Sequence, residues 1–316
     1  MTTKKIIAVV GATGAQGGGL ARAILNDPHS EFAVRAVTRD VHSDKAKSLA
    51  KLGAEVVAAN LDDADSLRRA FDGAYGAFCV TFFWAHFSPD LEIAQAHHMA
   101  HAAQAAHLKH VIWSTLEDSR QWSPLSDTHI PILMRKYKVP HMDAKGEADQ
   151  AFIEAGLPTT FLLTSFFWEN FIYFGMGPRR EPDGKLALTL PLMGAKLAGM
   201  AAEDIGKCAY GIFKRGAPAT RQCVGVAGEH LSGTQMAQAL GRALGEDVIF
   251  NDVPPQVYRG FGFPGAQELG NMFQIEAEHA DDMLGVRNIE ASRKLNPALQ
   301  SFDVWLTLNK NRIPLS

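Results

Sequence analysis

The sequence predicts an α/β fold, a doubly wound parallel sheet followed by a smaller α/β lobe. Three observations lead to this prediction. A β-branched apolar run at residues 6–10 ends in regularly spaced glycines and is followed by a helical pattern. Strand-like and helix-like segments then alternate through the first half of the chain, as they do in parallel sheets. The chain has 316 residues and is 47% hydrophobic, which suffices for one large domain or a domain with a smaller companion.

The first strand and the turn after it carry the strongest functional signal. Ile6–Val10 is expected to be a buried strand, and Gly11, Gly14 and Gly17 then open an apolar helix. A strand, a glycine turn and a helix form the context that a dinucleotide-binding motif requires. The helix N-terminus offers free N–H groups and a positive dipole end to a pyrophosphate, and glycines let the backbone approach it. The alternative is a tight turn without a ligand; we favour a nucleotide site.

The second strand is expected at Phe32–Thr38, and Arg39 follows it directly. A site selective for NAD(H) usually places an acid here for the ribose 2′-hydroxyl, whereas an arginine suits the 2′-phosphate of NADP(H). The sequence therefore favours NADP(H), with NAD(H) as the alternative because Asp40 is adjacent. The plainer interpretation of Arg39 is a solvated surface side chain.

The alternation of strands and helices continues to residue 165. Strands are expected at 54–59, 74–81, 110–115 and 159–165, and helices at 67–71, 89–107 and 141–152. In such sheets the ligand lies outside the carboxyl ends of the strands, so Gly11, Arg39, Thr81 and Ser114 should face one crevice. Asp62, in the loop after the third strand, should lie near the adenine of a bound dinucleotide.

Composition and charge exclude several classes of protein. The formal net charge is −3, which leaves no electrostatic footprint for direct nucleic-acid binding. Cys79, Cys208 and Cys223 are scattered and form no CxxC pair, which fits a reducing cytosol. No apolar run reaches membrane-spanning length, and the chain enters its first strand without a signal-peptide pattern. We therefore expect a cytoplasmic protein that binds neither nucleic acid directly nor a membrane.

Two further stretches invite an interpretation. His97 and His101 are four residues apart, a spacing at which helical histidines can share a metal ion. No carboxylate or cysteine of fitting spacing accompanies them, so we expect a surface cluster and no metal site. Residues 116–138 have no clear period and contain two prolines. This stretch is expected to be an irregular insertion near the cleft, with a lid as one possible role.

The helix pattern HMDAKGEADQAF places His141 and Lys145 on one face, four residues apart. In the short-chain dehydrogenase pattern a tyrosine stands four residues before such a lysine and serves as acid or base, while the lysine holds the nicotinamide ribose. Here His141 occupies the tyrosine position, and an imidazole can also take up or release a proton near neutral pH. Lys145 and His141 are therefore the candidate catalytic residues. The plainer interpretation of His141 is a polar residue at a helix start, and both remain open.

Several separated motifs together resemble the NmrA-like family, a branch of atypical short-chain dehydrogenases, and most of all its NADP(H)-binding redox-sensor members. The resemblance rests on GATGAQGG, VTRD, HMDAKGE, FFWEN and GFPGAQELGNMF and covers almost the whole chain. It implies a Rossmann-type fold, a ribose contact from Lys145, and a set of further cofactor contacts. These would come from Gly11, Thr13, Gly14, Ala15, Gln16, Gly17, Arg39, Thr81, Phe82 and Phe83, with Phe167, Trp168, Glu169 and Asn170 at the cofactor's far end.

The chain departs from the sensor-like pattern at two places. Sensor-like members carry more basic residues after the second strand, where this chain has VHSD at 41–44. They also have a lysine in the helix after the fourth strand, where Ala94 stands here.

The C-terminal half is expected to hold the remaining sheet strands and the smaller lobe. We divide the chain into residues 1–155, the dinucleotide-binding domain, and 156–316, the last sheet strands with a substrate-side or partner-side lobe. Within the second part we expect strands at 185–190 and 223–227 and helices at 203–213, 233–244 and 302–308. Ser232 should cap the helix that follows it, although no acid stands three positions on.

Two classes of function compete. The first is a regulatory protein that senses NADP(H), turns over little and responds through a protein partner; the missing tyrosine and the resemblance favour it. The second is an NAD(P)H-dependent reductase of a small carbonyl, quinone or imine substrate, with Lys145 or His141 as proton donor. A roomy apolar pocket would favour the second, built from Phe82, Phe83, Trp84, Phe166 and Trp168. We favour the sensor, and the sequence names neither a substrate nor a partner.

Overall fold

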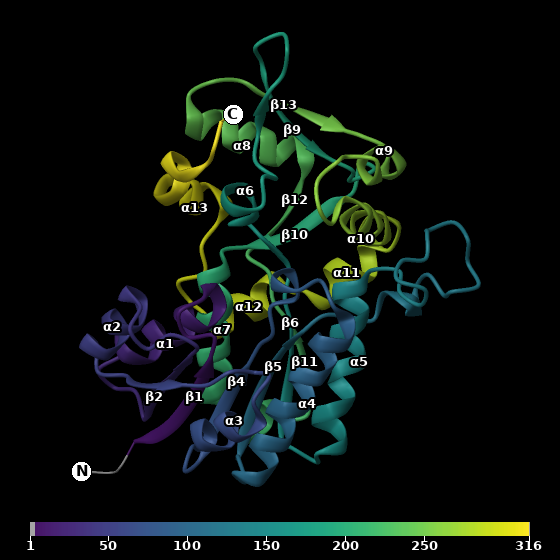
Figure 1. The fold of residues 1–316 in the computed structure, drawn as a ribbon. Helices are drawn as coiled ribbons and strands as arrows, with labels where there is room; N and C mark the ends of the chain where they lie inside the picture. Colours follow the sequence, from purple (N-terminus) through teal and green to yellow (C-terminus); the bar gives the residue numbers. More distant parts are fainter. Residues whose placement is uncertain (1–3, 316) are drawn as a thin grey trace.

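The computed structural model describes residues 4–315, and its centre is a seven-stranded sheet (Figure 1). The strand order is β11-β6-β5-β4-β1-β2-β3, and every neighbouring pair is parallel. The strands are β1 (Lys5–Val10), β2 (Phe32–Thr38), β3 (Glu55–Ala58), β4 (Gly76–Cys79), β5 (His110–Thr115), β6 (Thr159–Leu163) and β11 (Cys223–Gly225). The strand order reverses between β1 and β4, where doubly wound sheets bind their ligands. The predicted α/β fold is confirmed.

Helices cover both faces of the sheet (Figure 1). On one face pack α1 (Ala15–Leu25), α2 (Asp44–Lys51) and α7 (Ala202–Arg215); on the other pack α3 (Ala64–Phe71), α4 (Pro89–Ala105) and α5 (Pro140–Glu154). Side chains alternate along a strand, so β1 supplies both cores. Ile7 and Val9 are buried with Leu20 on the first face, whereas Ala8 and Val10 are buried on the second.

Glycines allow α1 and α7 to touch backbone to backbone. A Cβ on Gly206 of α7 would lie 2.1 Å from the backbone nitrogen of Leu20 and 2.4 Å from the carbonyl oxygen of Gln16. On the other helix, a Cβ on Gly19 would lie 2.3 Å from the carbonyl oxygen of Glu203. Neither position has room for any larger residue, so this contact holds α1 in place behind its glycine turn.

A second lobe lies beyond the carboxyl ends of the sheet (Figure 1). It holds two three-stranded sheets, ordered β12-β10-β7 and β13-β9-β8. Their strands are β7 (Phe166–Phe167), β8 (Arg179–Arg180), β9 (Leu186–Leu190), β10 (Lys196–Met200), β12 (Glu229–Ser232) and β13 (Val248–Asp252). The helices of this half, apart from α7, are α6 (Asn170–Tyr173), α8 (Gly233–Leu244), α9 (Pro255–Arg259), α10 (Ala266–Glu278), α11 (Ala280–Val286), α12 (Ile289–Leu295) and α13 (Phe302–Asn309). Its core includes the buried rings of Trp168, Phe302 and Trp305.

The structure differs from the sequence-based expectations mainly in this half. The elements that were not predicted are strands β7, β8, β10, β12 and β13 and helices α6, α9, α10, α11 and α12. Strand β4 ends at Cys79, two residues short of the predicted end, and β6 ends at Leu163. Ser232 does cap α8, and Gln235 closes the cap from the third helical position by accepting a bond from the backbone N–H of Ser232 at 2.9 Å.

The irregular stretch 116–138 is fastened at both ends by one carboxylate. Asp143 of α5 is fully buried and accepts hydrogen bonds from the backbone N–H and hydroxyl of Ser119 and from the backbone N–H groups of Lys138 and Val139. Burial raises the pKa of this carboxyl, while these hydrogen bonds act in the opposite direction. The insertion therefore closes back onto the helix that carries the candidate catalytic residues.

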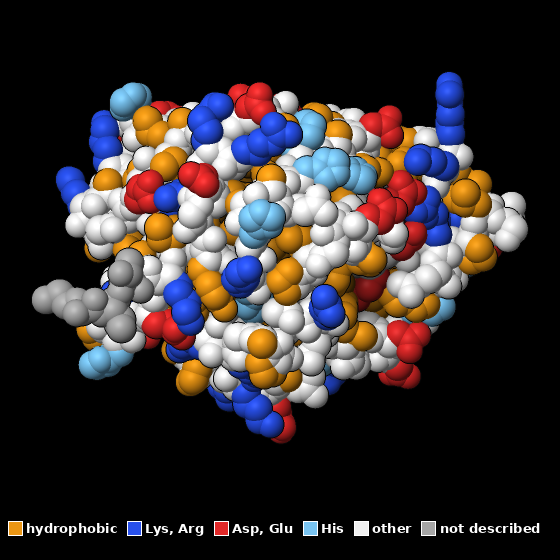
Figure 2. Space-filling model, turned by 90° about the horizontal axis from the view of Figure 1, so that it is seen from below, with side chains coloured by type: hydrophobic (Ala, Val, Ile, Leu, Met, Phe, Trp, Pro, Cys, Tyr) orange, Lys and Arg blue, Asp and Glu red, His pale blue; other side chains and the backbone are white. Residues whose placement is uncertain are grey.

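The molecular surface carries mixed charge. The end of the molecule opposite the lobe shows lysine and arginine interspersed with aspartate and glutamate, with no single gathered basic surface (Figure 2). Between residues 4 and 315, no helix is both long enough and apolar enough to cross a membrane.

Candidate functional site

The turn after β1 forms a cradle that fits a pyrophosphate. Gly11 has φ +64°, in the region that favours glycine, and a Cβ on Gly17 would lie 2.5 Å from the carbonyl oxygen of Gly11. Helix α1 begins after Gly14 without a side-chain cap and without an acid in its first turn. Its first N–H groups and its positive dipole end are therefore open to an anion.

Side chains predicted to contact the adenosine half lie at the neighbouring strand ends. Thr13 lies against Thr38, with 3.4 Å between the two hydroxyl oxygens. Arg39 is exposed after β2, and within residues 4–315 its guanidinium makes no ion pair. Asp62 is exposed in the loop after β3, where its carboxylate accepts a 2.9 Å hydrogen bond from the side-chain amide of Gln95. These groups share the carboxyl edge of the sheet with the glycine turn.

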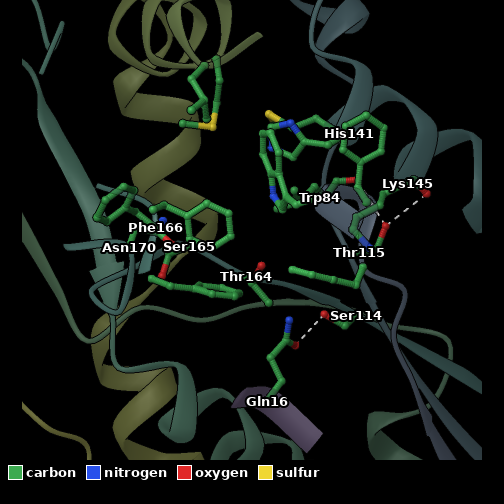
Figure 3. A pocket seen from close by; sticks show the side chains of 18 of the residues that line it. Gln16, Trp84, Ser114, Thr115, His141, Lys145, Thr164, Ser165, Phe166 and Asn170 are labelled. Carbon is green, nitrogen blue, oxygen red and sulfur yellow. Dashed lines mark hydrogen bonds between the residues drawn. The ribbon is translucent and has the colours of Figure 1, made fainter. Parts of the chain in front are cut away.

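A pocket of about 170 Å³ continues from this edge toward the lobe (Figure 3). About half of the residues that line it are aromatic, methionine or leucine, and the others are polar or charged. The predicted site residues that the structure brings together here are Gln16, Thr81, Phe82, Phe83, His141, Lys145, Phe167 and Asn170. The lobe contributes Leu269, Met272 and Glu276 from α10. The pocket thus lies between the nucleotide cradle and the second lobe.

Lys145 is held in a buried polar network on one side of the pocket. Its ammonium lies 2.8 Å from a carboxylate oxygen of Glu92, which is fully buried, and donates a 2.7 Å hydrogen bond to the hydroxyl of Thr81. The Thr81 hydroxyl in turn donates to Glu92, and His86 lies 3.5 Å from the other Glu92 oxygen. The charge of Lys145 is therefore balanced, and its direction is fixed. Nearby, Ser114 donates a 2.8 Å hydrogen bond to the Gln16 side chain (Figure 3).

His141 is oriented by a carboxylate from the lobe. One oxygen of Glu268 lies 2.7 Å from the imidazole Nδ1 and 2.6 Å from the backbone nitrogen of His141. Both side chains are buried, and the imidazole packs against Trp84, with 5.0 Å between ring centroids. Because Nδ1 is engaged by the carboxylate, Nε2 is the ring nitrogen left for a molecule in the pocket. A histidine held in this way can act as a proton donor or acceptor.

A second carboxyl group of α10 reaches the same pocket. The Oε2 atom of Glu276 is buried, and no described residue supplies it with a hydrogen-bond partner; the same holds for the hydroxyl of Ser165. Burial raises the pKa of Glu276 to about 7, although the charges of Arg287 and His141 act to lower it. Arg287 is itself buried and binds Glu117 through two bonds of 2.6 and 2.7 Å.

Trp168 and Glu169, expected at the cofactor's far end, do not reach the pocket. The Trp168 ring is buried in the lobe, 5.2 Å from the ring centroid of Phe302. Glu169 accepts hydrogen bonds from the backbone N–H of Ala202 at 2.8 Å and from the indole of Trp305 at 3.0 Å. The Glu169 carboxylate thus fastens α7 and α13 to the lobe and Trp168 packs against α13, while their neighbours Phe167 and Asn170 line the pocket.

Sequence reasoning missed three acids that define the site, Glu92, Glu268 and Glu276. One signal was present for the last two, since they are eight residues apart on a single apolar helix and therefore share a face. The contact between Glu268 and His141 could not be inferred from the sequence, because the two residues are 127 positions apart.

The histidines of α4 lie away from the pocket. The rings of His97 and His101 are neighbours, with 6.0 Å between their centroids. Across residues 4–315, no group of three or more His, Cys, Asp or Glu side chains is arranged to hold a metal ion.

Comparison with known proteins agrees with this geometry. The model of the NmrA-like family matches residues 3–306. The NmrA-like family domain-containing oxidoreductase ptmS of Penicillium ochrochloron is 25% identical, over 96% of this chain and 97% of its own. The crystal structure of NmrA, a negative transcriptional regulator, in complex with NADP has a TM-score of 0.77 at 24% identity, covering 97% of this chain and 95% of its own. Triphenylmethane reductase from Citrobacter sp., complexed with NADP(H), has a TM-score of 0.73 at 18% identity, covering 96% and 99% of the two chains.

Proposed function

Since the chain belongs to the NmrA-like family, we propose that it binds NADP(H) across the glycine turn and acts as a redox sensor or regulatory protein with little turnover. The observation that carries the proposal is the cradle at Gly11, Gly14 and Gly17, which lies between an exposed Arg39 and the pocket around Lys145. The structures of NmrA and of triphenylmethane reductase, both solved with this cofactor, support the choice of ligand.

In this proposal each part of the crevice has a separate task. The backbone from Thr13 to Gly17 holds the pyrophosphate, and Arg39 binds the 2′-phosphate. Lys145 donates to the nicotinamide ribose, for which its ammonium hydrogens are suited. NADP(H), when bound, supplies hydride chemistry at its nicotinamide ring. The absence of a tyrosine four residues before Lys145 favours sensing over turnover, and a protein partner then reads the cofactor state. We place the protein in the cytoplasm, and residues 1–155 remain our proposed dinucleotide-binding domain.

Replacing Arg39 with alanine tests the cofactor assignment. Losing one charge-assisted contact costs about 1.5–3 kcal/mol, so Arg39→Ala should weaken NADPH binding at least about tenfold. NADH has no 2′-phosphate, so its affinity should change little. Calorimetric titration of both cofactors into both proteins measures this selectivity.

Arg22→Ala is the matched control, because Arg22 is a partly exposed arginine of α1 whose guanidinium is already 3.6 Å from a carboxylate oxygen of Glu203 and which does not line the pocket. It should leave both affinities unchanged. Equal binding of NADH and NADPH to the unmutated protein, or an unchanged NADPH affinity in Arg39→Ala, would contradict the proposal.

The alternative function is an NAD(P)H-dependent oxidoreductase of a small carbonyl, quinone or imine. The specific observation in its favour is the bond between His141 and Glu268, because a buried carboxylate that orients an imidazole toward a pocket is an arrangement suited to proton transfer. The oxidoreductase ptmS belongs to the same family, which also supports this alternative.

Turnover distinguishes the two functions. If the protein is an enzyme, His141→Ala should lower the rate of NADPH oxidation by about 10²–10⁴, the usual contribution of general acid catalysis, while cofactor affinity stays nearly intact. The measurement is NADPH absorbance during incubation with quinones, aldehydes and imines. Sustained multiple turnover that collapses in His141→Ala would favour the enzyme, whereas cofactor binding without turnover favours the sensor.

A further inference from the structure

We propose that the pocket binds an organic cation, an amine or iminium nitrogen carried on an apolar body, with the carboxylate of Glu276 as its counter-ion. The inference rests on the proposed function in one respect: the ligand would bind in the pocket that adjoins the proposed cofactor crevice. It applies equally to a substrate and to a regulatory ligand, since it concerns recognition and not turnover.

The first argument is an unsatisfied buried group. Glu276 lines the pocket, yet its Oε2 is buried without a hydrogen-bond partner among residues 4–315. Buried polar atoms in folded proteins are almost always paired, and an unpaired one marks a place where a ligand, an ion or a water completes the bonding. A ligand N–H that donates to this oxygen would remove the cost of its burial.

The second argument is the balance of charge around Glu276. The charged or titratable groups that face it from other elements are Glu117 after β5, Arg287 after α11, and His141 of α5. Arg287 is paired with Glu117 through two hydrogen bonds. His141 is hydrogen-bonded to Glu268, which lies on the same helix as Glu276. Across the pocket Lys145 is paired with Glu92. Among the described residues that line the pocket, Glu276 is then the acid without an ion-pair partner.

The third argument is the chemistry of the walls. The pocket is lined by the rings of Phe82, Phe83, Trp84, Phe166, Phe167 and Phe174 and by three methionines. Aromatic faces attract a cation that has left water, and apolar side chains accommodate the body that carries it. Phe82 and Phe174 are 57% and 43% exposed, so apolar rings also stand at the solvent side of the pocket.

The choice between a cation and a neutral ligand depends on the protonation of Glu276. Burial raises its pKa to about 7, so the group carries its charge above that pH and loses it below. A cation should therefore bind better as the pH rises through this value. A carbonyl compound that accepts a hydrogen bond from the protonated acid should show the opposite trend.

The experiment compares 3-phenylpropylamine with 3-phenylpropan-1-ol, which have similar bodies and differ in charge. At about pH 8.5, where the amine is protonated and Glu276 is ionised, the amine should bind at least about tenfold more tightly than the alcohol by calorimetry. At about pH 5.5 this preference should shrink, since the amine keeps its charge while Glu276 is neutralised. Glu276→Gln should bind the two compounds equally at both pH values.

Glu278→Gln is the control, because Glu278 lies on the same helix but outside the lining of the pocket; it should keep the preference. Thermal melting establishes that each variant is folded. Equal binding of amine and alcohol to the unmutated protein, no amine binding at millimolar concentration, or a preference that survives in Glu276→Gln would each overturn the proposal. Tighter alcohol binding at the lower pH would identify Glu276 as a neutral donor instead. NADPH titrated separately reports on the proposed function, so either proposal can fail without the other.

Discussion

Lys145→Met is expected to lower the free energy of unfolding by about 3 kcal/mol, because it leaves the charge of Glu92 buried without its main partner. Glu92 is fully buried, and only 12% of the Lys145 side chain is exposed, so water cannot replace the lost contact. The second Glu92 oxygen has no hydrogen-bond partner among residues 4–315, so no described group takes the place of the lost ammonium. Denaturant unfolding measures the change. NADPH affinity should also fall, by roughly 1–2 kcal/mol, as the ribose loses a hydrogen bond.

The double variant Lys145→Met, Glu92→Gln separates these two effects. Removing the carboxylate charge should restore most of the stability, since an apolar or neutral replacement of both partners costs far less than removal of one. NADPH affinity should stay low, because the proposed ribose contact is made by Lys145 and not by Glu92. Full recovery of cofactor affinity in the double variant would contradict the proposed role of Lys145. An unchanged stability in Lys145→Met would contradict the importance of the ion pair.

Gly206→Ala should be the most damaging of the small substitutions in the sheet domain. The new Cβ would lie 2.1 Å from one backbone atom of α1 and 2.4 Å from another, so the two helices must separate. Overpacking of this kind costs about 3 kcal/mol and should lower the melting temperature by several degrees. Since α1 carries the phosphate cradle at its N-terminus, NADPH affinity should fall with it.

Gly285→Ala provides the matched control. Gly285 is also a helical glycine, but nothing lies within 4 Å of the position where its Cβ would be. Alanine is a better helix former than glycine, so this variant should be as stable as the parent or slightly more so. Equal melting temperatures for Gly206→Ala and the parent would show that the contact between α1 and α7 is looser than the backbone distances indicate.

The parts of the fold that are determined by residues close together in the sequence could be predicted. Strand β1, its glycine turn and α1 follow one another without a gap, so local pattern and backbone freedom suffice to define them. Strands β2 and β5 were placed to the residue because each is an apolar run bounded by polar or loop residues. The bounds of β4 and β6 were less accurate: the predicted ends, Thr81 and Ser165, lie two residues beyond the observed ends and belong to the lining of the pocket.

For the candidate site, the sequence predicted residues that lie on the same helix, but not their contacts with residues on other helices. His141 and Lys145 were found because they share a single helix face. Their partners, Glu268 and Glu92, come from other helices and are specified by tertiary packing, which no local period reports. The FFWEN motif shows the same limit: Phe167 and Asn170 line the pocket, whereas the side chains of Trp168 and Glu169 pack and bond within the lobe, and the local sequence does not distinguish the two pairs.

The order in which the seven-stranded sheet is assembled has a consequence for the synthesis of the protein. Strand β5 is finished at Thr115, yet its neighbour β6 begins at Thr159 and the edge strand β11 ends only at Gly225. At roughly 5–20 residues per second, a ribosome needs about 5–20 seconds to pass from β5 to the end of β11. During that interval the nascent chain carries an apolar strand with an open edge, a form that invites pairing with other chains. Helix α1, which ends at Leu25, likewise lacks its packing partner until α7 has been synthesised from Ala202 onward. A cell that makes this protein must therefore shield an unfinished sheet, so chaperone capacity, as well as the final stability, should limit its yield.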